Sequence, residues 1–348
     1  MKGENMSKPK IFITQPIEES ALKRLQAAMD VEVHPDATQP ISKEDLIRGV
    51  RNKDFLFCRL HDTIGAEALE ANPNLKLIAT MATSPGQIDM KTATRLKIPV
   101  TGRDVPVEGV TRDSIIEETA DMAWTLLMAV ARRLVEGDAM VRSGVTFPGC
   151  QSLYLVGSQV HGKTLGIVGM GKIGRAMARR AKGFNMKVLF CKRTRDPETE
   201  REFGAVQTSL EDLLRQSDFV SLHAAYSPET HHLIGAKELD MMKPTAFLIN
   251  TARGQIVDQD ALIDALRGKK IGGAGLDVYK GEPQPNLPGD FLKMKNVVLT
   301  PHLGSAVAEK REIMANTVAD IFLDFLSGKK PKRIFNPEVL AHPNPSQV

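Results

Sequence analysis

The sequence contains few cysteines and no regular cysteine pattern. Its three cysteines, Cys58, Cys150 and Cys191, are odd in number, widely separated and in no Cys/His ligand spacing. Such a chain shows neither a disulfide framework nor a zinc site, and it fits a reducing compartment. We therefore predict a cytoplasmic protein without a bound metal ion.

The sequence also lacks a secretory signal, a long apolar run and a basic block. Residues Met1 to Lys10 are polar, and the longest apolar stretch is interrupted by Thr125 and ends at Arg132. The 46 Lys and Arg residues against 42 Asp and Glu give a net charge of +4, and aromatic residues are only 5%. We therefore predict no export, no membrane insertion and no nucleic-acid partner.

The composition that remains is that of a folded protein. Hydrophobic residues make up 42% and charged residues 25% of the chain, which excludes an intrinsically disordered, collagen-like or coiled-coil protein. A chain of 348 residues exceeds the size at which one hydrophobic core usually stops growing. We therefore expect two domains.

The first third of the chain alternates β-rich runs with helical segments. We predict strands at Ile11–Thr14, Val31–His34, Phe55–Arg59 and Leu77–Thr80, and helices at Ser20–Met29 and Lys43–Arg51. This alternation is typical of a parallel α/β sheet. The pattern changes at Thr111–Ser114, and we place a domain boundary near residue 112.

A long helix is predicted from about Ser114 to Val141, with Ser114 and Glu117 spaced as a capping box. It is apolar almost all round between Ala120 and Ala131, so it should be buried on more than one side. Both a core helix of one domain and a helix shared between subunits fit this pattern. The following residues, 143–159, are predicted to form a loop arm.

A second series of strands and helices begins at Lys163. We predict six strands, at Thr164–Val168, Lys187–Cys191, Phe219–His223, Ala246–Asn250, Gly273–Asp277 and Val297–Thr300. Six strands in such a series indicate a doubly wound dinucleotide-binding fold. Beyond Ser305 a helical run extends to about Leu326 and precedes a basic tail.

A glycine-rich turn follows the first strand of this series. Its residues are Gly169, Met170, Gly171, Lys172, Ile173 and Gly174. The first glycine permits a tight turn, the second lets the backbone approach a pyrophosphate, and the third allows the helix to pack closely on the strand. The helix N-terminus adds N–H donors, so we predict a dinucleotide site here.

The residues after the second strand indicate which dinucleotide is bound. An NAD site normally carries Asp or Glu there to bind the ribose hydroxyls, whereas this chain has Lys192, Arg193 and Thr194. Arg193 offers a planar set of donors to a 2′-phosphate, and Lys192 adds a second positive charge. We therefore predict NADP(H), with NAD(H) as the alternative.

Three further strand ends carry residues suited to catalysis. Arg253 can bind a carboxylate through two hydrogen bonds, and His302 can exchange a proton. Glu282, if it lies beside His302, would orient the imidazole ring and favour its protonated form. Since ligands of open α/β sheets bind at the carboxyl ends of the strands, we expect these residues to meet at the edge that also holds the glycine-rich turn.

In this series of motifs the sequence resembles the D-isomer-specific 2-hydroxyacid dehydrogenases, most closely NADP-dependent glyoxylate and hydroxypyruvate reductases. The resemblance covers nearly the whole chain. It implies that Arg253, Glu282 and His302 are catalytic and that Asp277 contacts the nicotinamide amide. Further cofactor contacts implied by the resemblance are the residues Met170 to Ile173, His223, Ala224, Thr230, Thr251, Ala252 and Gly304.

The resemblance also implies how the chain is organised. A substrate-binding domain of the flavodoxin-like type would consist of residues 1–111 and 305–348, and a Rossmann dinucleotide-binding domain of residues 112–304. The subunits would form a homodimer through the dinucleotide-binding domains.

The chain departs from the family pattern in the segment expected to bind the substrate carboxylate through backbone N–H groups. The family usually has a Val-Gly or Ala-Gly pair in this segment. Here Ser84, which follows Thr83, stands in place of the glycine, and Pro85 removes a nearby N–H donor. Thr83 and Ser84 remain our candidates for this contact. Arg59, at the end of an early strand, is a candidate for the distal end of the substrate, although a structural role fits it equally well.

From these features we predict an oxidoreductase that transfers hydride between NADPH and the carbonyl carbon of a small 2-keto acid. Two alternatives share the same fold. One is the oxidation of phosphite or formate, and the other is a non-catalytic, nucleotide-sensing scaffold of the corepressor type.

Overall fold

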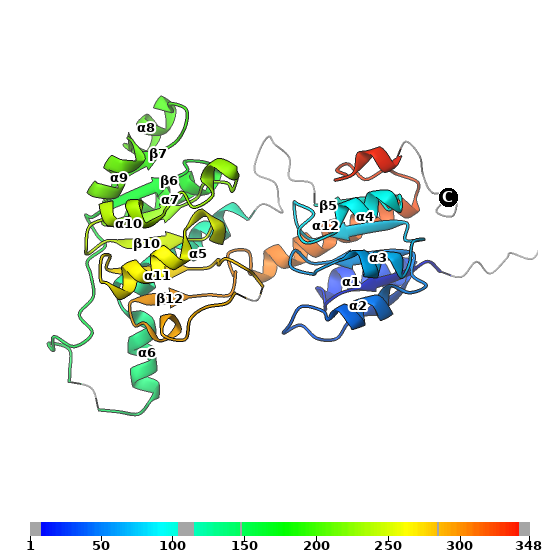
Figure 1. Ribbon diagram of the computed structural model, residues 1–348, viewed down its shortest axis with the longest axis horizontal. Coiled ribbons are helices and arrows are strands. Elements are labelled where there is room, and N and C mark those ends of the chain that lie inside the picture. The colour runs from blue at the N-terminus through cyan, green and yellow to red at the C-terminus, as the bar shows by residue number, and fades with distance from the viewer. Residues whose placement is uncertain (1–7, 104–114, 147, 284, 341–348) are drawn as a thin grey trace, which may run out of the picture. The chain divides into compact units, whose positions relative to one another are not determined.

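The computed structural model describes residues 8–103, 115–146, 148–283 and 285–340 (Figure 1). The chain divides into two compact units, one of residues 1–114 with 307–348 and the other of residues 115–306. We call the first the split unit, because both ends of the chain contribute to it, and the second the central unit. The two predicted domain boundaries, 111/112 and 304/305, lie close to these divisions, and the first falls outside the described residues.

The split unit contains a five-stranded parallel sheet in the order β2-β1-β3-β4-β5. Its strands are β1 (Lys10–Ile13), β2 (Asp30–Val33), β3 (Phe55–Cys58), β4 (Leu77–Thr80) and β5 (Val100–Gly102), and its helices are α1 (Glu19–Ala28), α2 (Lys43–Val50), α3 (Ala66–Glu70), α4 (Met90–Arg95) and α12 (Ala308–Leu326). Every residue of β3 and β4 is buried, as expected for parallel strands covered on both faces. This strand order is the flavodoxin-like one that we predicted.

The C-terminal part of the chain completes this unit. Phe322 of α12 is fully buried, and its ring lies 5.7 Å from Phe55 and 6.0 Å from Phe57 between centroids. Near the end of the described chain, the Asn336 side chain accepts the backbone N–H of Val100 at 2.9 Å and donates to the carbonyl of Ile98 at 2.9 Å. The C-terminal segment is therefore part of the core and edge of the split unit.

The central unit contains a seven-stranded parallel sheet in the order β12-β11-β10-β9-β6-β7-β8. Its strands are β6 (Thr164–Val168), β7 (Lys187–Cys191), β8 (Val206–Gln207), β9 (Phe219–Leu222), β10 (Phe247–Asn250), β11 (Gly273–Leu276) and β12 (Val297–Leu299). The strand order reverses between β6 and β9, which is the switch point of a doubly wound fold. The six predicted strands are present, and β8 was not predicted because two residues carry no periodicity.

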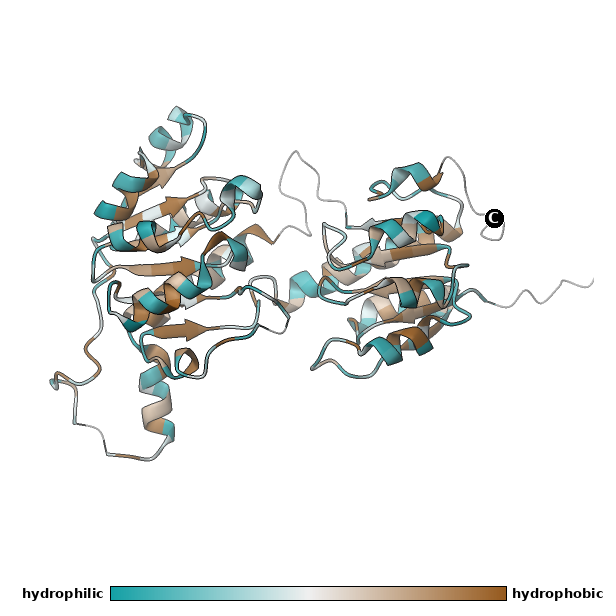
Figure 2. Ribbon diagram, viewed as in Figure 1, coloured by the Kyte–Doolittle hydropathy of each residue, from teal (hydrophilic) through white to brown (hydrophobic). Residues whose placement is uncertain are grey.

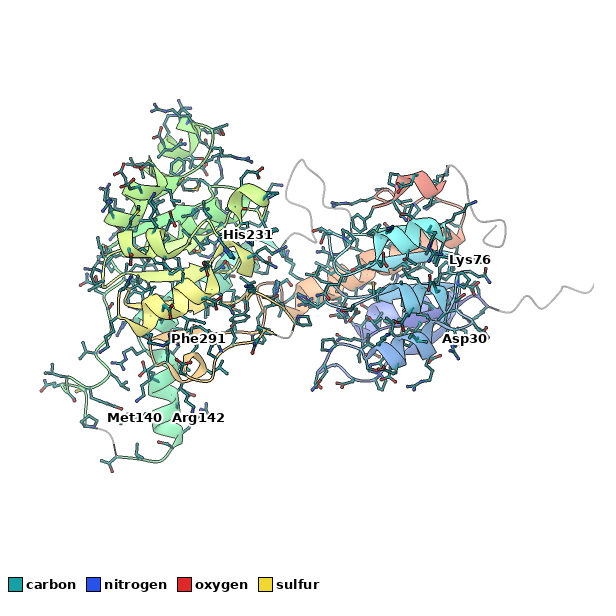
Figure 3. The ribbon with its side chains drawn as sticks, viewed as in Figure 1. Asp30, Lys76, Met140, Arg142, His231 and Phe291 are labelled. Atoms are coloured by element: carbon teal, nitrogen blue, oxygen red, sulfur yellow. The ribbon has the colours of Figure 1, made fainter. Side chains whose placement is uncertain are left out.

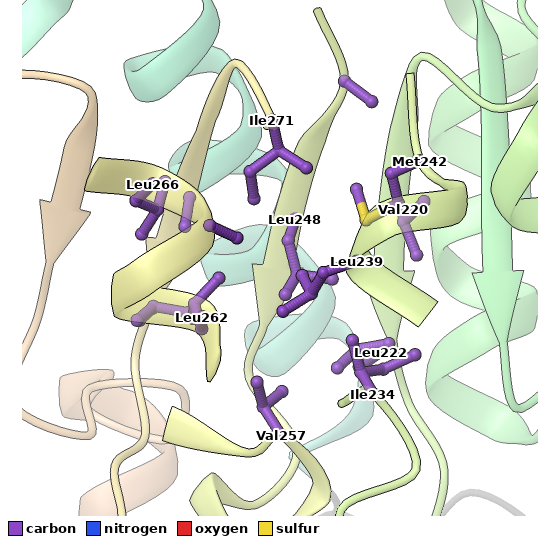
Figure 4. Packing of buried hydrophobic residues seen from close by; sticks show 14 of the residues in the cluster. Val220, Leu222, Ile234, Leu239, Met242, Leu248, Val257, Leu262, Leu266 and Ile271 are labelled. Atoms are coloured by element: carbon purple, nitrogen blue, oxygen red, sulfur yellow. The ribbon is translucent and has the colours of Figure 1, made fainter. Parts of the chain in front are cut away.

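Two layers of helices cover this sheet. The α-helices of this unit are α5 (Ile116–Ala131), α6 (Leu134–Arg142), α7 (Lys172–Gly183), α8 (Pro197–Phe203), α9 (Leu210–Gln216), α10 (Ala236–Met241) and α11 (Gln259–Arg267), of which α6 buries no residue. Residues of α9, α10 and α11 pack on one face, where Leu239, Leu248 and Leu262 meet (Figure 4). Residues of α5 and α7 pack on the other face. In Figure 2 the strands are mainly brown, whereas the helices around them carry many teal, hydrophilic residues.

The apolar helix predicted from Ser114 to Val141 is in fact two helices. Helix α5 ends at Ala131, and Arg133 adopts φ = 52° before α6 begins. The Arg133 guanidinium binds Glu136 in the first turn of α6 at 2.7 and 2.8 Å, which stabilises the new helix start. Ser114 lies outside the described residues, so its predicted cap is not described.

The burial of α5 is explained within its own unit. Ala123, Leu126 and Leu127 expose at most 1% of their surface, and the helix packs on α7, β10 and β11. Of the two alternatives for this apolar helix, a core helix of one domain or a helix shared between subunits, its burial fits the core helix. No helix among the described residues is both long and apolar enough to cross a membrane.

Candidate active site

The glycine-rich turn connects β6 to α7, as predicted. Gly169 has φ = +95°, and a Cβ atom there would lie 2.5 Å from the backbone nitrogen of Ala224. At Gly174 a Cβ atom would lie 2.4 Å from the carbonyl oxygen of Gly169. These two glycines are thus required by the turn and by helix packing. At Gly171 a Cβ atom would meet no protein atom within 4 Å, so open space remains beside this residue.

Two polar atoms at the same edge of the sheet are buried without a hydrogen-bond partner among the described residues. They are Nδ1 of His223, just after β9, and Oγ1 of Thr251, just after β10. Buried polar atoms normally have a partner, so these atoms are suited to bind a ligand. Together with the space beside Gly171, they show that this edge fits a dinucleotide.

The imidazole of His223 is neutral in this environment. Burial lowers the pKa of His223 to about 3, and its Nε2 lies 2.8 Å from the hydroxyl oxygen of Ser221. Beyond it, the loop after β9 carries Ala224 and the short helix η1 (Pro228–Thr230). The Thr230 hydroxyl donates to the carbonyl of Ala225 at 2.8 Å, so it stabilises this loop.

The loop after β7 carries the predicted cations. Lys192 forms an ion pair with Asp196, with 2.7 Å between Nζ and Oδ2. Arg193 and Thr194 are exposed. The Ser227 side chain and, to a smaller extent, the charge of Arg193 lower the pKa of the Glu229 carboxyl, so Glu229 is an exposed charge neighbour of Arg193. Arg193 is therefore available to an anionic ligand, whereas Lys192 already has a partner.

Arg253, Glu282 and His302 follow β10, β11 and β12, which are neighbours in the sheet. The three residues therefore lie at one edge, as predicted. Oε2 of Glu282 lies 2.6 Å from Nδ1 of His302. The other carboxylate oxygen, Oε1, accepts the backbone N–H of Tyr279 at 2.6 Å. Since a carboxylate only accepts, Nδ1 of His302 carries the proton of this contact, which fixes the tautomer and orientation of the ring.

Asp277 holds the turn on which His302 lies. Its Oδ1 accepts the Leu303 backbone N–H at 2.7 Å and the Thr300 hydroxyl at 2.6 Å, and its Oδ2 accepts the Gly304 N–H at 2.8 Å. Only 1% of Asp277 is exposed. The sequence did not reveal this structural role. An aspartate at the end of a strand that is expected to be buried does, however, indicate a hydrogen-bonded carboxylate.

The turn that carries Arg253 is similarly constrained. The Asn250 side chain donates to the Arg253 carbonyl and accepts the Ala252 N–H, both at 3.0 Å. The guanidinium Nη1 of Arg253 donates to the Ala252 carbonyl at 2.6 Å. At Gly254 a Cβ atom would lie 2.0 Å from the carbonyl carbon of Tyr279, so the turns after β10 and β11 meet backbone to backbone.

The remaining site candidates belong to the split unit. Thr83 is half-buried and Ser84 is exposed in the irregular segment after β4. Arg59, after β3, donates from Nη2 to the Pro16 carbonyl at 2.5 Å and from Nη1 to the Met81 sulfur at 3.0 Å. These bonds hold the Arg59 side chain against its own unit.

A glycine-rich turn at the switch point of a doubly wound sheet, with a His–Glu pair and an arginine at the same edge, defines a nicotinamide-dinucleotide-dependent dehydrogenase. Comparison with known families agrees. The family model "D-isomer specific 2-hydroxyacid dehydrogenase, NAD binding domain" matches residues 124–304. The chain belongs to this family and is an NAD(P)-dependent oxidoreductase that acts on 2-keto or 2-hydroxy acids.

Relatives match along nearly the whole chain. The glyoxylate reductase of Thermococcus litoralis is 46% identical over 341 residues, which are 97% of this chain and 100% of that protein. The glyoxylate reductase of Pyrococcus horikoshii is 44% identical over 96% of this chain and 97% of its own length. The crystal structure of a putative D-isomer specific 2-hydroxyacid dehydrogenase from Polaromonas sp. JS6 66 matches with a TM-score of 0.82 and 31% identity, over 94% of this chain and 99% of that chain.

Proposed function

We propose that this enzyme reduces a small 2-keto acid such as glyoxylate or hydroxypyruvate to the D-2-hydroxy acid, with NADPH as its favoured hydride donor. The observation that carries the proposal is the contact between Glu282 and His302, at 2.6 Å, at the sheet edge that also holds Arg253. The relatives named glyoxylate reductase support this substrate class.

The side chains supply acid catalysis and orientation. His302 gives a proton from Nε2 to the carbonyl oxygen of the substrate, while Glu282 holds the opposite ring nitrogen. Arg253 binds the substrate carboxylate through its guanidinium and polarises the adjacent carbonyl. When bound, NAD(P)H supplies the hydride that reaches the carbonyl carbon.

The cofactor is held by the carboxyl edge of the central sheet. In this proposal the turn Gly169 to Gly174 would hold the pyrophosphate, because the N-terminus of α7 and its N–H groups favour an anion. Atoms such as His223 Nδ1 and Thr251 Oγ1 gain a partner from the ligand. The other proposed cofactor-binding residues follow the strands of the same sheet edge. They are Ala224, Thr230 and Ala252, together with Asp277 and Gly304, which would lie near the nicotinamide.

The preference for NADPH rests on Arg193. Its side chain is exposed and interacts only through its charge with the exposed Glu229 among the described residues, so it can bind a 2′-phosphate through a charge-assisted hydrogen bond. Lys192 contributes less, because Asp196 already binds it at 2.7 Å. Thr194, which follows Arg193, is the third proposed cofactor-binding residue of this loop.

Residues of the split unit set the substrate range in this proposal. The N–H groups near Thr83 and Ser84 bind the substrate carboxylate. In this proposal Arg59 shapes the distal side of the substrate site, and its bonds to Pro16 and Met81 fix the position of its guanidinium.

The proposal includes a homodimer in the cytoplasm, with α6 and the following arm at the interface. Leu134, Val141, Leu153 and Val156 each expose more than half of their surface. Figure 3 shows Met140 and Arg142 where α6 projects away from the sheet of the central unit. A groove of about 530 Å³ is lined by Met140 of α6 and by apolar residues that include Val135, Val145 and Leu155. Exposed apolar surface of this extent is typical of an interaction surface, and the family resemblance indicates a second copy.

A substrate panel tests the proposed function. We expect turnover of glyoxylate or hydroxypyruvate, with a kcat/KM roughly 10- to 150-fold higher for NADPH than for NADH at fixed ionic strength. Arg193→Ala should lower the efficiency with NADPH much more than that with NADH. Oxidation of phosphite or formate would favour the first alternative activity, and tight cofactor binding without turnover would favour a sensor.

A further inference from the structure

The loop after β7 contains a buried carboxylate, Asp196, between two cations. Only 7% of Asp196 is exposed. Its Oδ2 lies 2.7 Å from Nζ of Lys192 and 3.2 Å from Nη2 of Arg175. The hydrogen bonds from Lys192 and from the Thr199 backbone hold the pKa of the Asp196 carboxyl well below its usual range. Asp196 is therefore negatively charged at neutral pH, and it offsets positive charge beside the ribose-binding loop.

The same residue organises the backbone of the loop. Oδ1 of Asp196 accepts the N–H of Thr199 at 3.1 Å and caps α8. The Gln207 side chain accepts the Asp196 N–H at 2.9 Å and donates to the carbonyls of Lys192 and Thr194 at 3.2 and 3.0 Å. This network ties down both neighbours of Arg193 and leaves the Arg193 side chain outside it.

We propose that Asp196 is a positioning residue for cofactor choice, because its carboxylate competes with an adenosine 2′-phosphate for Lys192. The inference rests on the proposed function, in which the loop after β7 meets the 2′-phosphate. In the native protein, discrimination between the two dinucleotides falls mainly on Arg193. Removal of the Asp196 charge releases Lys192 to bind the phosphate as well.

Asp196→Asn tests this inference, because asparagine caps a helix as well as aspartate does and keeps the backbone N–H that Gln207 accepts. We expect the Kd for NADPH to fall about 2- to 5-fold, as for the gain of one exposed charge pair, while the Kd for NADH stays the same. Cofactor fluorescence measures both constants without turnover. Added salt should reduce the gain.

A double-mutant cycle shows whether Lys192 carries the effect. Lys192→Met in the Asp196→Asn background should cancel the gain in NADPH affinity. In the wild-type background the same substitution should weaken NADPH less than Arg193→Ala does. If Lys192→Met and Arg193→Ala weaken NADPH equally in the wild-type background, Lys192 already binds the phosphate and the inference is wrong.

Asp89→Asn is a matched control, because Asp89 caps α4 in the split unit and accepts the N–H of Thr92 at 3.0 Å, as Asp196 accepts that of Thr199. It should leave the ratio of the two Kd values unchanged. Should Asp196→Asn fold poorly, Asp196→Ser keeps a capping oxygen and removes the same charge. Unchanged or weaker NADPH binding in the folded variant overturns the inference, because Asp196 would then not compete for Lys192.

The result is separable from the NADPH preference itself. A wild type that binds both cofactors equally, with no effect of Arg193→Ala, refutes the preference but still allows a gain in Asp196→Asn. A wild type that prefers NADPH through Arg193, with no gain in Asp196→Asn, refutes only the role of Asp196.

Discussion

Asp277 and Gly304, 27 residues apart in the sequence, are joined by a hydrogen bond of 2.8 Å from the Gly304 N–H to the Asp277 carboxylate. The same carboxylate accepts the Leu303 N–H and the Thr300 hydroxyl. The turn that carries His302 after β12 is thus held by the end of the neighbouring strand β11. The chain runs on from β11 to Glu282, which lies 2.6 Å from His302, so Asp277 ties the end of β11 to the turn that carries His302.

The first prediction concerns Thr300→Val, which removes the hydroxyl that donates to Asp277 at 2.6 Å and nearly preserves the side-chain volume. A lost hydrogen bond to a buried charge should lower the free energy of unfolding by about 1–3 kcal/mol. We expect kcat to fall while the Kd of the dinucleotide changes little. Denaturant unfolding and steady-state kinetics measure these effects, and Thr300→Ser should restore both. Wild-type values of stability and kcat in Thr300→Val would contradict this role.

The second prediction concerns the side chains that we propose to be catalytic. His302→Ala or Arg253→Ala should lower kcat by at least about 100-fold, because each removes proton transfer or substrate orientation. The dinucleotide should still bind, because neither change touches the glycine-rich turn. Glu282→Gln should have a smaller effect, since the amide can still accept a hydrogen bond from His302. Nearly normal turnover in both alanine variants would remove the catalytic assignment.

The third prediction separates two glycines of the glycine-rich turn between β6 and α7. Gly174→Ala should destabilise the fold, because the new methyl group would lie 2.4 Å from the Gly169 carbonyl oxygen. Gly171→Ala meets no protein atom within 4 Å, so it should unfold at nearly the wild-type temperature and bind the dinucleotide more weakly. Thermal unfolding without ligand and cofactor titration distinguish the two. Unchanged cofactor affinity in Gly171→Ala would mean that the dinucleotide does not approach this residue.

The fourth prediction concerns pH and His223. Burial lowers the pKa of His223 to about 3, whereas the unfolded chain binds this proton near its ordinary pKa of about 6.5. Between these two values the unfolded state binds more protons, so stability is lost as the pH falls through this window. His223 should therefore lower the free energy of unfolding by up to about 1.4 kcal/mol for each unit by which the pH falls in this window.

The variant His223→Gln isolates that contribution. Denaturant unfolding at about pH 7, 5.5 and 4.5 should show a steeper loss of stability in the wild type than in the variant. The difference should reach roughly 2–3 kcal/mol over this range. Parallel curves for the two proteins would show that His223 titrates normally in the folded state.

The fifth prediction concerns the oligomeric state. Light scattering should give about twice the chain mass of 38.2 kDa. Leu134→Lys together with Val141→Lys should produce monomers, because both side chains are exposed on α6 and neither contributes to the core. Leu326→Lys, at an exposed position of α12 in the split unit, is a control that should leave the mass unchanged. A wild-type monomer at micromolar concentration would refute the dimer.

The sequence predicted the sheets and the strand-end residues because these depend on local patterns. A glycine-rich turn between a strand and a helix has a direct physical reason for each glycine. Residues such as Arg253, Glu282 and His302 could be grouped because neighbouring parallel strands end at one edge. Asp277 was assigned a cofactor contact by resemblance, but its three bonds to the His302 turn depend on a conformation with φ = 58° at His302 that no pattern indicates.

Two other features also required the structure. The break between α5 and α6 lies at Arg133, which adopts a positive φ without the glycine or proline that usually marks such a break. The pairing of Lys192 with Asp196 was not predicted, because the residues lie in a loop whose shape depends on hydrogen bonds to Gln207, beyond α8. It changes the interpretation of Lys192 from an available cation to a neutralised one.

The order of strands in the central sheet has a consequence for long-range electrostatics. Arg193 follows β7 and His302 follows β12, and five steps between neighbouring strands separate them in the order β12-β11-β10-β9-β6-β7. At about 4.8 Å per step this is roughly 24 Å across the sheet. That separation exceeds twice the Debye length of about 8–10 Å at physiological ionic strength. A charge reversal at Arg193 should therefore leave the proposed proton transfer at His302 unaffected. A substitution that changes the cofactor preference at Arg193 should need no compensating change around His302.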